Sequence, residues 1–117
     1  MLEFICYPKC TTCTKARKWL DKNEIEYRER NIKEDRPSAD ELKNIITLSG
    51  VSVRKLFNTS GKLYREMGLK DKLPDMSEND MIDLLASDGM LVKRPIAIND
   101  NTALIGFKET EWAEKLL

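Results

Sequence analysis

The sequence predicts an α/β fold in which helices cover one mixed β-sheet. The chain of 117 residues has the length of one compact domain. Its beginning reads strand, helix, strand and its end reads strand, strand, helix, whereas the long middle section carries helical patterns only. We therefore expect a single domain over residues 1–117, with a helical insertion at about 38–89.

The N-terminal elements follow from apolar runs and their stop signals. Residues 2–7 form an apolar run that a proline ends, as expected of a buried strand. Thr11 or Thr12 can cap a helix that continues to about Asn23. Residues 26–32 then give a second strand, which runs into a polar turn.

The middle section opens with a strong helix signal. Ser38 and Glu41 have the spacing of a capping box, which predicts a helix over 39–49 that Gly50 ends. Residues 51–57 are expected to continue as a short helix.

The rest of the middle section reads as a loop and further helices. Residues 58–61 break the pattern, and 64–73 are expected to be irregular or a short helical turn. Ser77 can cap another helix, for which Gly89 is the predicted stop.

The C-terminal part changes from helical to strand patterns. Residues 96–98 and 103–105 read as two strands joined by a turn at 99–101, which predicts a hairpin. Thr110 can cap a final helix that contains Trp112.

Composition limits the classes of partner. Twenty basic and twenty acidic residues give a formal net charge of zero, so we expect neither direct DNA binding nor attraction to an anionic membrane. No apolar run approaches the roughly 18 residues of a membrane span, and the N-terminal one is too short for a signal peptide. We therefore expect a cytoplasmic protein. The charged residues 28–30 read as a solvated strand face.

Cys10 and Cys13 form a C-x-x-C sequence where the first strand gives way to the first helix. A helix N-terminus carries unpaired amide donors and partial positive charge, which favour a thiolate. Lys9, Lys15 and Arg17 add positive charge nearby. Cys10 is therefore the candidate nucleophile, and Cys13, one turn later, is the candidate resolving thiol.

Two other interpretations of the cysteines stay open. The C-x-x-C sequence is also half of a zinc site, but the chain has no second pair and no histidine, and Cys6 would give only a third ligand. The pair can also be two ordinary thiols. Paired cysteines in a reducing compartment serve redox or metal chemistry more often than structural stapling. Because this C-x-x-C lies between a strand and a helix, which is the context of the redox motif, we expect no metal and a reversible Cys10–Cys13 disulfide. Cys6 reads as a small core residue that stays reduced.

Arg94 and Pro95 are the second feature of interest. A proline just before a strand restricts the residue that precedes it and can adopt the cis form. Taken by itself, Arg94 beside Lys93 reads as a solvated cation.

Several sequence blocks together resemble the arsenate reductase/Spx family, in particular its short Spx/MgsR-like bacterial members. The blocks are residues 7–13, 58–61 with 64–66, 91–96 and 105–109. They fall in the family's order and spacing and cover nearly the whole chain. The resemblance implies a thioredoxin-like fold with a helical insertion, in which Pro95 is a cis-proline facing the cysteines.

The resemblance also implies an anion-binding site. Glutaredoxin-coupled arsenate reductases have their nucleophile at the position of Cys10 and hold the oxyanion with three arginines. Arg94 matches one arginine, the second position is Asn58, and the third falls near Gly106 or Phe107. A dianion held by one guanidinium lacks most of its paired charge, so arsenate reduction is expected to be weak. The expected substrate-binding residues are Arg94, Pro95, Thr11, Thr12 and Asn58.

Two functions are compatible with the resemblance. The first is a thiol–disulfide oxidoreductase that acts on a disulfide or oxyanion, has no bound cofactor, and takes electrons from glutathione/glutaredoxin or thioredoxin. The second is a redox-sensing transcriptional regulator resembling Spx, which binds RNA polymerase through a Cys10–Cys13 switch. Cys13 stands where those reductases usually have serine, whereas Spx-type proteins carry the C-x-x-C. Spx-type regulators commonly extend further, so an end at Leu117 favours the enzyme.

Overall fold

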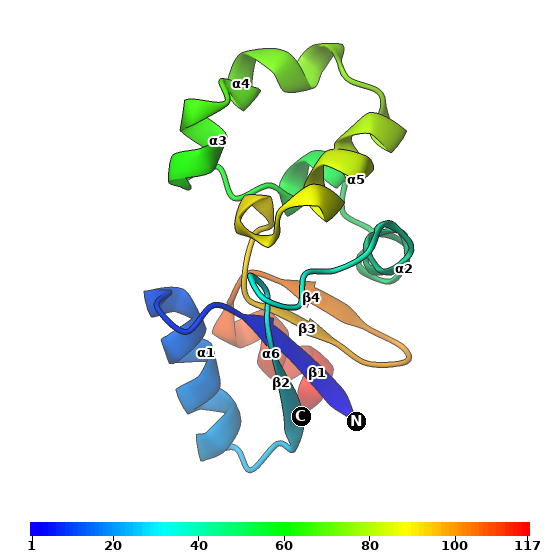
Figure 1. The fold of residues 1–117 in the computed structure, drawn as a ribbon. Helices are drawn as coiled ribbons and strands as arrows, with labels where there is room; N and C mark the ends of the chain where they lie inside the picture. Colours follow the sequence, from blue (N-terminus) through cyan, green and yellow to red (C-terminus); the bar gives the residue numbers. More distant parts are fainter.

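The computed structural model describes all 117 residues, and a four-stranded sheet with helices on both faces forms its lower half in Figure 1. The strand order is β2-β1-β3-β4. β1 (Leu2–Cys6) pairs in parallel with β2 (Tyr27–Asn31) and antiparallel with β3 (Ile96–Ile98), which forms a hairpin with β4 (Ala103–Ile105). The predicted mixed sheet is confirmed.

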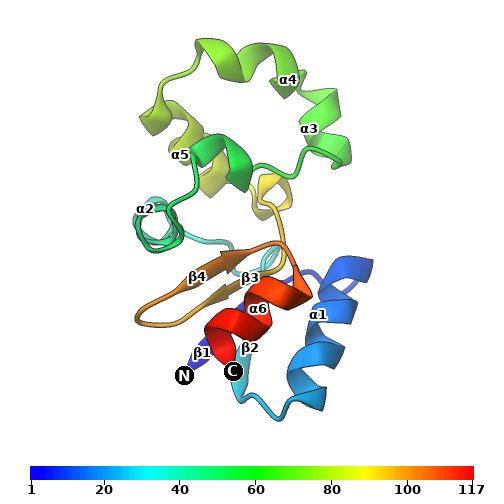
Figure 2. The same ribbon diagram turned by 180° about the vertical axis from the view of Figure 1, so that it is seen from behind.

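Side chains of β1 alternate between two hydrophobic clusters, one on each face of the sheet. Phe4 and Cys6 pack in the cluster shared with α1 (Thr11–Lys22) and α6 (Glu109–Leu116), which lie together in Figure 2. Ile5 points to the other face, into the cluster built by the middle helices. This alternation is what a strand with two covered faces requires.

Between β2 and β3 the chain forms helices; the first of them packs against β4, and the later ones lie further away, beyond one end of the sheet in Figure 1. The α-helices are α2 (Ala39–Ser49), α3 (Lys62–Glu66), α4 (Leu69–Lys72) and α5 (Glu78–Ser87), with 3-10 turns at Val53–Leu56, Leu73–Asp75 and Gly89–Leu91. The expected short helix within residues 51–57 is the 3-10 turn at Val53–Leu56. Residues 64–73, expected to be irregular or a short helical turn, instead belong to α3, α4 and the start of the next 3-10 turn. None of the helices in the structure has the length and apolar character needed to cross a bilayer.

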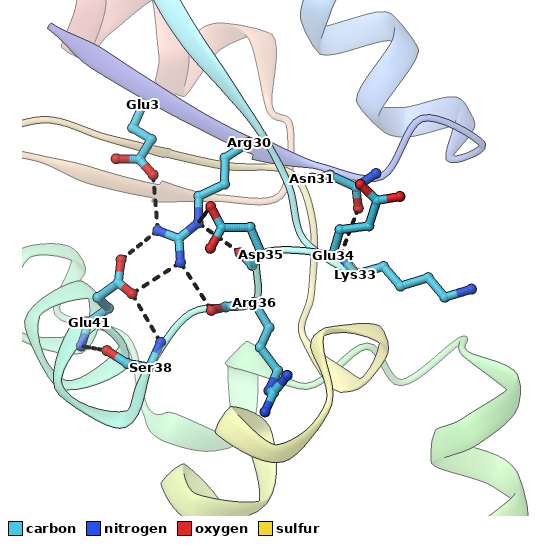
Figure 3. A network of polar contacts seen from close by, with 9 residues as sticks. All are labelled: Glu3, Arg30, Asn31, Lys33, Glu34, Asp35, Arg36, Ser38 and Glu41. Carbon is cyan, nitrogen blue, oxygen red and sulfur yellow. Dashed lines mark hydrogen bonds and ion pairs between the residues drawn. The ribbon is translucent and has the colours of Figure 1, made fainter.

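α2 begins and ends as the sequence predicts. The Ser38 hydroxyl accepts a hydrogen bond from the Glu41 N–H at 3.1 Å, and the Glu41 carboxylate accepts one from the Ser38 N–H at 3.1 Å (Figure 3). Gly50 follows the helix with a φ of 72°, in the left-handed region. The capping box and the glycine stop are both confirmed.

Two predicted helix starts are wrong by one or two residues. Cys10 occupies the N-cap of α1, and neither of the following threonines caps the helix. α6 begins at Glu109, so Thr110 lies inside its first turn and Lys108 is the N-cap. In both helices a residue with no capping side chain takes the boundary position, because the preceding chain fixes where the helical backbone begins.

The predicted stop at Gly89 is also wrong. α5 ends at Ser87, and Gly89 opens the next 3-10 turn. A Cβ atom on Gly89 would lie 1.8 Å from the carbonyl oxygen of Ile32, so glycine is required there for a close approach of two backbones. Gly89 is therefore needed for the close packing against Ile32 and does not mark the end of a helix.

Of the charged residues 28–30 on β2, Arg28 and Glu29 are exposed to solvent, but Arg30 is not. The Arg30 side chain is only 9% exposed and donates to the Glu3 carboxylate at 3.0 Å and to the carbonyls of Asp35 and Arg36 at 2.8 and 3.0 Å. It also pairs with Glu41 at the start of α2 (Figure 3). Arg30 thus joins the edge strand, β1 and α2, which corrects the expectation of a solvated cation.

Candidate active site

Cys10 lies half-exposed where β1 passes into α1. The Cys10 N–H donates to the Tyr7 carbonyl at 3.0 Å, which closes the turn between strand and helix. The Cys10 carbonyl accepts from the Thr14 N–H at 3.1 Å, the first hydrogen bond of the helix. The sulfur therefore sits at the helix N-terminus, where backbone donors have no intrahelical partner.

The surroundings of Cys10 favour its thiolate. Burial raises the pKa of the thiol, but the N–H groups of Cys13 and Thr12, the Cys13 side chain and the charge of Arg94 outweigh it. The pKa of Cys10 consequently lies below its ordinary value. A thiolate at this position is the nucleophilic form.

Cys13 is fully buried one turn further along α1. Its sulfur accepts a hydrogen bond from the Tyr7 N–H at 3.3 Å. A hydrogen bond with the Cys6 thiol and burial raise the pKa of Cys13 strongly, so this thiol keeps its proton. Within the motif, Cys10 thus has a lowered pKa and Cys13 a raised one.

Cys6 is buried, as expected of a core residue, but its thiol has polar partners. Nη2 of Arg17 lies 3.4 Å from the Cys6 sulfur, and Nε of the same arginine binds Glu29 at 2.8 Å. The hydrogen bond with Cys13 is the largest cause that lowers the pKa of Cys6, and Arg17 lowers it further. Sequence reasoning placed Arg17 near the motif but missed this contact. The spacing of four residues puts Cys13 and Arg17 on one face of the helix, but it does not indicate the contact of Arg17 with Cys6 on β1.

A cavity of about 470 Å³ opens beside Cys10. It is lined by Cys10, Thr12, Asn58, Ser60, Gly61, Lys93, Arg94, Ile105, Gly106, Phe107 and Lys108. The lining contains three cations and no carboxylate, so it suits an anionic group.

Most of the expected site residues meet at this cavity. Arg94 and Asn58 line it together with Thr12, whereas Thr11 is exposed outside the lining. Cys13 is fully buried and is not part of the lining, and Pro95 is buried and joined to Arg94 by a cis peptide bond.

Arg94 is held in place rather than free in solvent. Its Nη1 donates to the carbonyls of Met90 and Val92, both at 3.3 Å. Its guanidinium carbon lies 5.4 Å from the centre of the Tyr7 ring, a cation–π distance. The interpretation of Arg94 as a solvated cation is therefore wrong, and its Nη2 and Nε can face a ligand.

Comparison with known proteins gives a consistent set of matches. A model of the ArsC family matches residues 6–115. The uncharacterized protein YusI of Bacillus subtilis is 50% identical over 113 residues, which are 97% of this chain and 96% of YusI. The global transcriptional regulator Spx of Streptococcus pyogenes is 33% identical over 95% of this chain and 81% of the regulator.

Solved structures agree with this assignment. The crystal structure of an ArsC family related protein from Bacteroides fragilis has a TM-score of 0.95 at 50% identity, covering 97% of this chain and 95% of that chain. The arsenate reductase from Vibrio cholerae has a TM-score of 0.84 at 25% identity, covering 99% and 97%. The predicted thioredoxin-like fold and the predicted resemblance to the arsenate reductase/Spx family are confirmed.

Proposed function

The chain belongs to the ArsC family, and on that premise we propose that it is a thiol–disulfide oxidoreductase with Cys10 as nucleophile and Cys13 as resolving thiol. One observation carries the proposal. A half-exposed thiol with a lowered pKa lies at the wall of a cationic cavity, and a buried, protonated thiol lies one helical turn behind it. This is the arrangement that two successive thiol–disulfide exchanges need.

The proposed reaction proceeds in two exchanges. The Cys10 thiolate attacks one sulfur of a substrate disulfide, and the other sulfur leaves as a thiolate. Cys13 then attacks the Cys10 sulfur and releases the second substrate thiol, which leaves a Cys10–Cys13 disulfide. Two electrons have passed to the substrate. Glutathione/glutaredoxin or thioredoxin would return them, with no bound cofactor, in a cytoplasmic setting where such donors operate.

The proposed binding residues give the cavity its preference for anions. Arg94 offers Nη2 and Nε, Asn58 offers an amide, and Thr12 and Thr11 stand at the N-terminus of α1. Pro95 is buried and follows Arg94 through a cis peptide bond. We propose that residues 1–117 act as one domain, in which the helical section at about 38–89 supplies the wall with Asn58.

Arsenate is a poor fit to this cavity as a principal substrate. Of the three positions at which arsenate reductases of this family have arginines, only one is an arginine here, Arg94. The second position is Asn58, and the third falls at Gly106 or Phe107. Lys93 and Lys108 supply charge to the cavity but not the paired, planar donors of arginine. We therefore propose weak arsenate turnover at most.

The named relatives favour one second candidate. Spx of Streptococcus pyogenes and the regulatory protein MgsR of Bacillus subtilis match 95% and 94% of this chain. On this alternative the protein is a redox-sensing regulator that binds RNA polymerase, and the Cys10–Cys13 disulfide is its switch.

A trapping experiment separates the two candidates. In a Cys13→Ser variant the mixed disulfide on Cys10 cannot be resolved, so a tagged variant should capture its substrate or electron donor covalently from cell extract. The matched control carries Cys10→Ser as well. Covalent capture that needs Cys10 supports the oxidoreductase. No covalent capture, together with recovery of RNA polymerase by the oxidised wild-type protein and by neither variant, contradicts the oxidoreductase and supports the regulator.

A further inference from the structure

β4 forms one edge of the sheet, and its outer side has no partner strand. The strand order ends at β4, which lies with α2 above it and α6 below it in Figure 2. An unpaired edge strand presents free N–H and C=O groups, to which another extended chain can add as a further strand.

The hydrogen bonds at the two ends of the hairpin fix the orientation of its backbone groups. The Gly106 N–H donates to the Pro95 carbonyl at 2.8 Å, and the Asn99 N–H donates to the Thr102 carbonyl at 2.9 Å. In an antiparallel pair of strands, hydrogen-bonded residue pairs alternate with pairs whose N–H and C=O groups point away from the partner strand. Every second residue of β4, counted from these two pairs, therefore points outward.

The outward residues are Ala103 and Ile105. They lie opposite Ile98 and Ile96, in the positions between the hydrogen-bonded pairs. Their N–H and C=O groups therefore point away from β3, to the side on which the sheet has no fifth strand. No hydrogen bond outside the sheet uses these groups.

A cavity of about 470 Å³ follows this outer side of β4, and we call it the edge groove. It is lined by residues 101–105, by the end of α2 and by α6. Three of its lining residues, Lys93, Ile105 and Lys108, also line the cavity beside Cys10. The two cavities therefore adjoin each other, and a strand bound along β4 would lead to the nucleophile.

The edge groove is positively charged. Its charged lining consists of four lysines and two glutamates, namely Lys55, Lys93, Lys108, Lys115, Glu111 and Glu114. All four lysines are exposed, and none takes part in an ion pair of the structure. A second copy of this chain would bring the same lysines against them, whereas an acidic chain would neutralise them. Charge therefore selects an acidic partner over a second copy.

We propose that the substrate disulfide belongs to a protein with an extended, acidic segment, which pairs with the outer edge of β4 as a fifth strand and brings its cysteine to Cys10. This inference rests on the proposed thiol–disulfide function and names its substrate class. Backbone pairing with Ala103 and Ile105 supplies affinity, and the lysines supply the preference for acidic side chains. Cys10 attacks the segment's cysteine sulfur and releases the thiolate bonded to it; Cys13 then attacks Cys10 and releases the segment, so two electrons pass to the substrate.

Synthetic peptides test the pairing. Each has one cysteine, present as a mixed disulfide with 5-thio-2-nitrobenzoate, and about six further residues in which glutamate and threonine alternate. The cysteine is N-terminal in one peptide and C-terminal in the other, because an edge strand can pair in either direction. Release of the coloured thiolate reports attack by Cys10. The faster peptide should react about tenfold faster than its lysine-for-glutamate counterpart, and high salt should reduce this ratio.

Methylation of alternate backbone nitrogens separates strand pairing from charge. Two isomers of the faster peptide carry the methyl groups on opposite sets of alternate amides, and only one set faces β4 in a paired strand. One isomer should keep the rate of the unmethylated peptide, and the other should lose about tenfold, the net contribution of two hydrogen bonds. Ala103→Pro removes an outward N–H and no hydrogen bond of the hairpin, and should also slow the unmethylated peptide.

Charge reversal in the protein tests the edge groove. Lys55 and Lys115 line the edge groove but not the cavity beside Cys10. The double variant Lys55→Glu/Lys115→Glu should therefore slow the acidic peptide about tenfold and leave the reaction with 5,5′-dithiobis(2-nitrobenzoate) unchanged. The matched control is Lys70→Glu/Lys72→Glu, an equal change of charge at exposed positions of α4, which should change neither rate.

The outcomes distinguish this inference from the proposed function. A wild-type protein that releases no thiolate from the small disulfide contradicts the function. Docking is then measured by fluorescence anisotropy on a fluorescein-labelled peptide with serine in place of cysteine, and binding that Lys55→Glu/Lys115→Glu weakens supports the inference. Equal rates for the two methylated isomers, or equal slowing by the control variant, overturn it. A dimer in solution that Ala103→Pro dissociates also overturns it, because a second copy would then occupy the edge.

Discussion

Replacing Arg30 with methionine removes the cation that joins β2 to β1 and α2 while keeping much of the side chain's volume. Arg30 is the largely buried member of the network in Figure 3, and its carboxylate partners are Glu3, Asp35 and Glu41. Because α2 leads toward the loop whose residues Asn58, Ser60 and Gly61 line the cavity, the substitution tests what holds the two halves of the site together.

The size of the effect follows from the exposure of each partner. Hydrogen bonds to charged groups contribute about 1.5–3 kcal/mol when both partners are shielded, but exposed pairs contribute only about 0.2–1 kcal/mol. The Glu3 and Glu41 side chains are 29% and 46% exposed, so their pairs with Arg30 lie between these limits. Together with the two carbonyl contacts, we expect a loss of about 2–3 kcal/mol and a fall in Tm of about 10 °C.

Urea unfolding followed by circular dichroism measures this loss. Arg28→Met is the matched control, because Arg28 lies on the same strand and is exposed. We expect the control to lose less than about 0.5 kcal/mol. In a double-mutant cycle with Glu41→Gln, the two losses should not add, because both break the same pair. Equal unfolding free energies for the Arg30 and Arg28 variants would refute the reasoning.

Three further outcomes follow from the site and its supports. The pKa of Glu41 is lowered to about 2, first by its hydrogen bond to Arg30. The stability that the Glu41 carboxylate contributes is therefore complete above its ordinary pKa near 4.5 and is lost as pH falls toward 2. Unfolding free energies measured over this pH range, for the wild type and for Glu41→Gln, check this. In single-cysteine variants, Cys10 should be alkylated faster near neutral pH than Cys13 or Cys6, and a faster reaction at either buried thiol would reverse the assigned roles. Arsenate reduction coupled to NADPH through glutaredoxin or thioredoxin should be weak, whereas efficient turnover that collapses in Arg94→Ala would mean that the single arginine suffices.

The sequence predicted those parts of the fold whose signals are local. Both strands of the C-terminal hairpin were predicted at their observed bounds, because two short apolar runs and the polar turn between them lie within ten residues. The same holds for α2, because Ser38 and Glu41 mark its start and Gly50 marks its end. The C-x-x-C motif and its place at a helix N-terminus were predicted for the same reason.

The errors concern contacts between distant segments. Arg30 finds a carboxylate on β1, 27 residues away, and nothing in the charged run around it indicates this partner. Gly89 is required by the backbone of Ile32, which no helix-stop rule can foresee. The contact of Arg17 with Cys6 likewise depends on how α1 packs on β1. Such features follow from tertiary packing, which overrides local pattern.

Mapping of the disulfide in the oxidised protein tests the central claim most directly. The protein is oxidised, its remaining thiols are alkylated, and the peptides are identified by mass spectrometry before and after reduction. The account predicts one reversible bond between Cys10 and Cys13, with Cys6 alkylated as a free thiol and far-ultraviolet circular dichroism unchanged. A dominant bond to Cys6, or no bond within the chain at all, would contradict it.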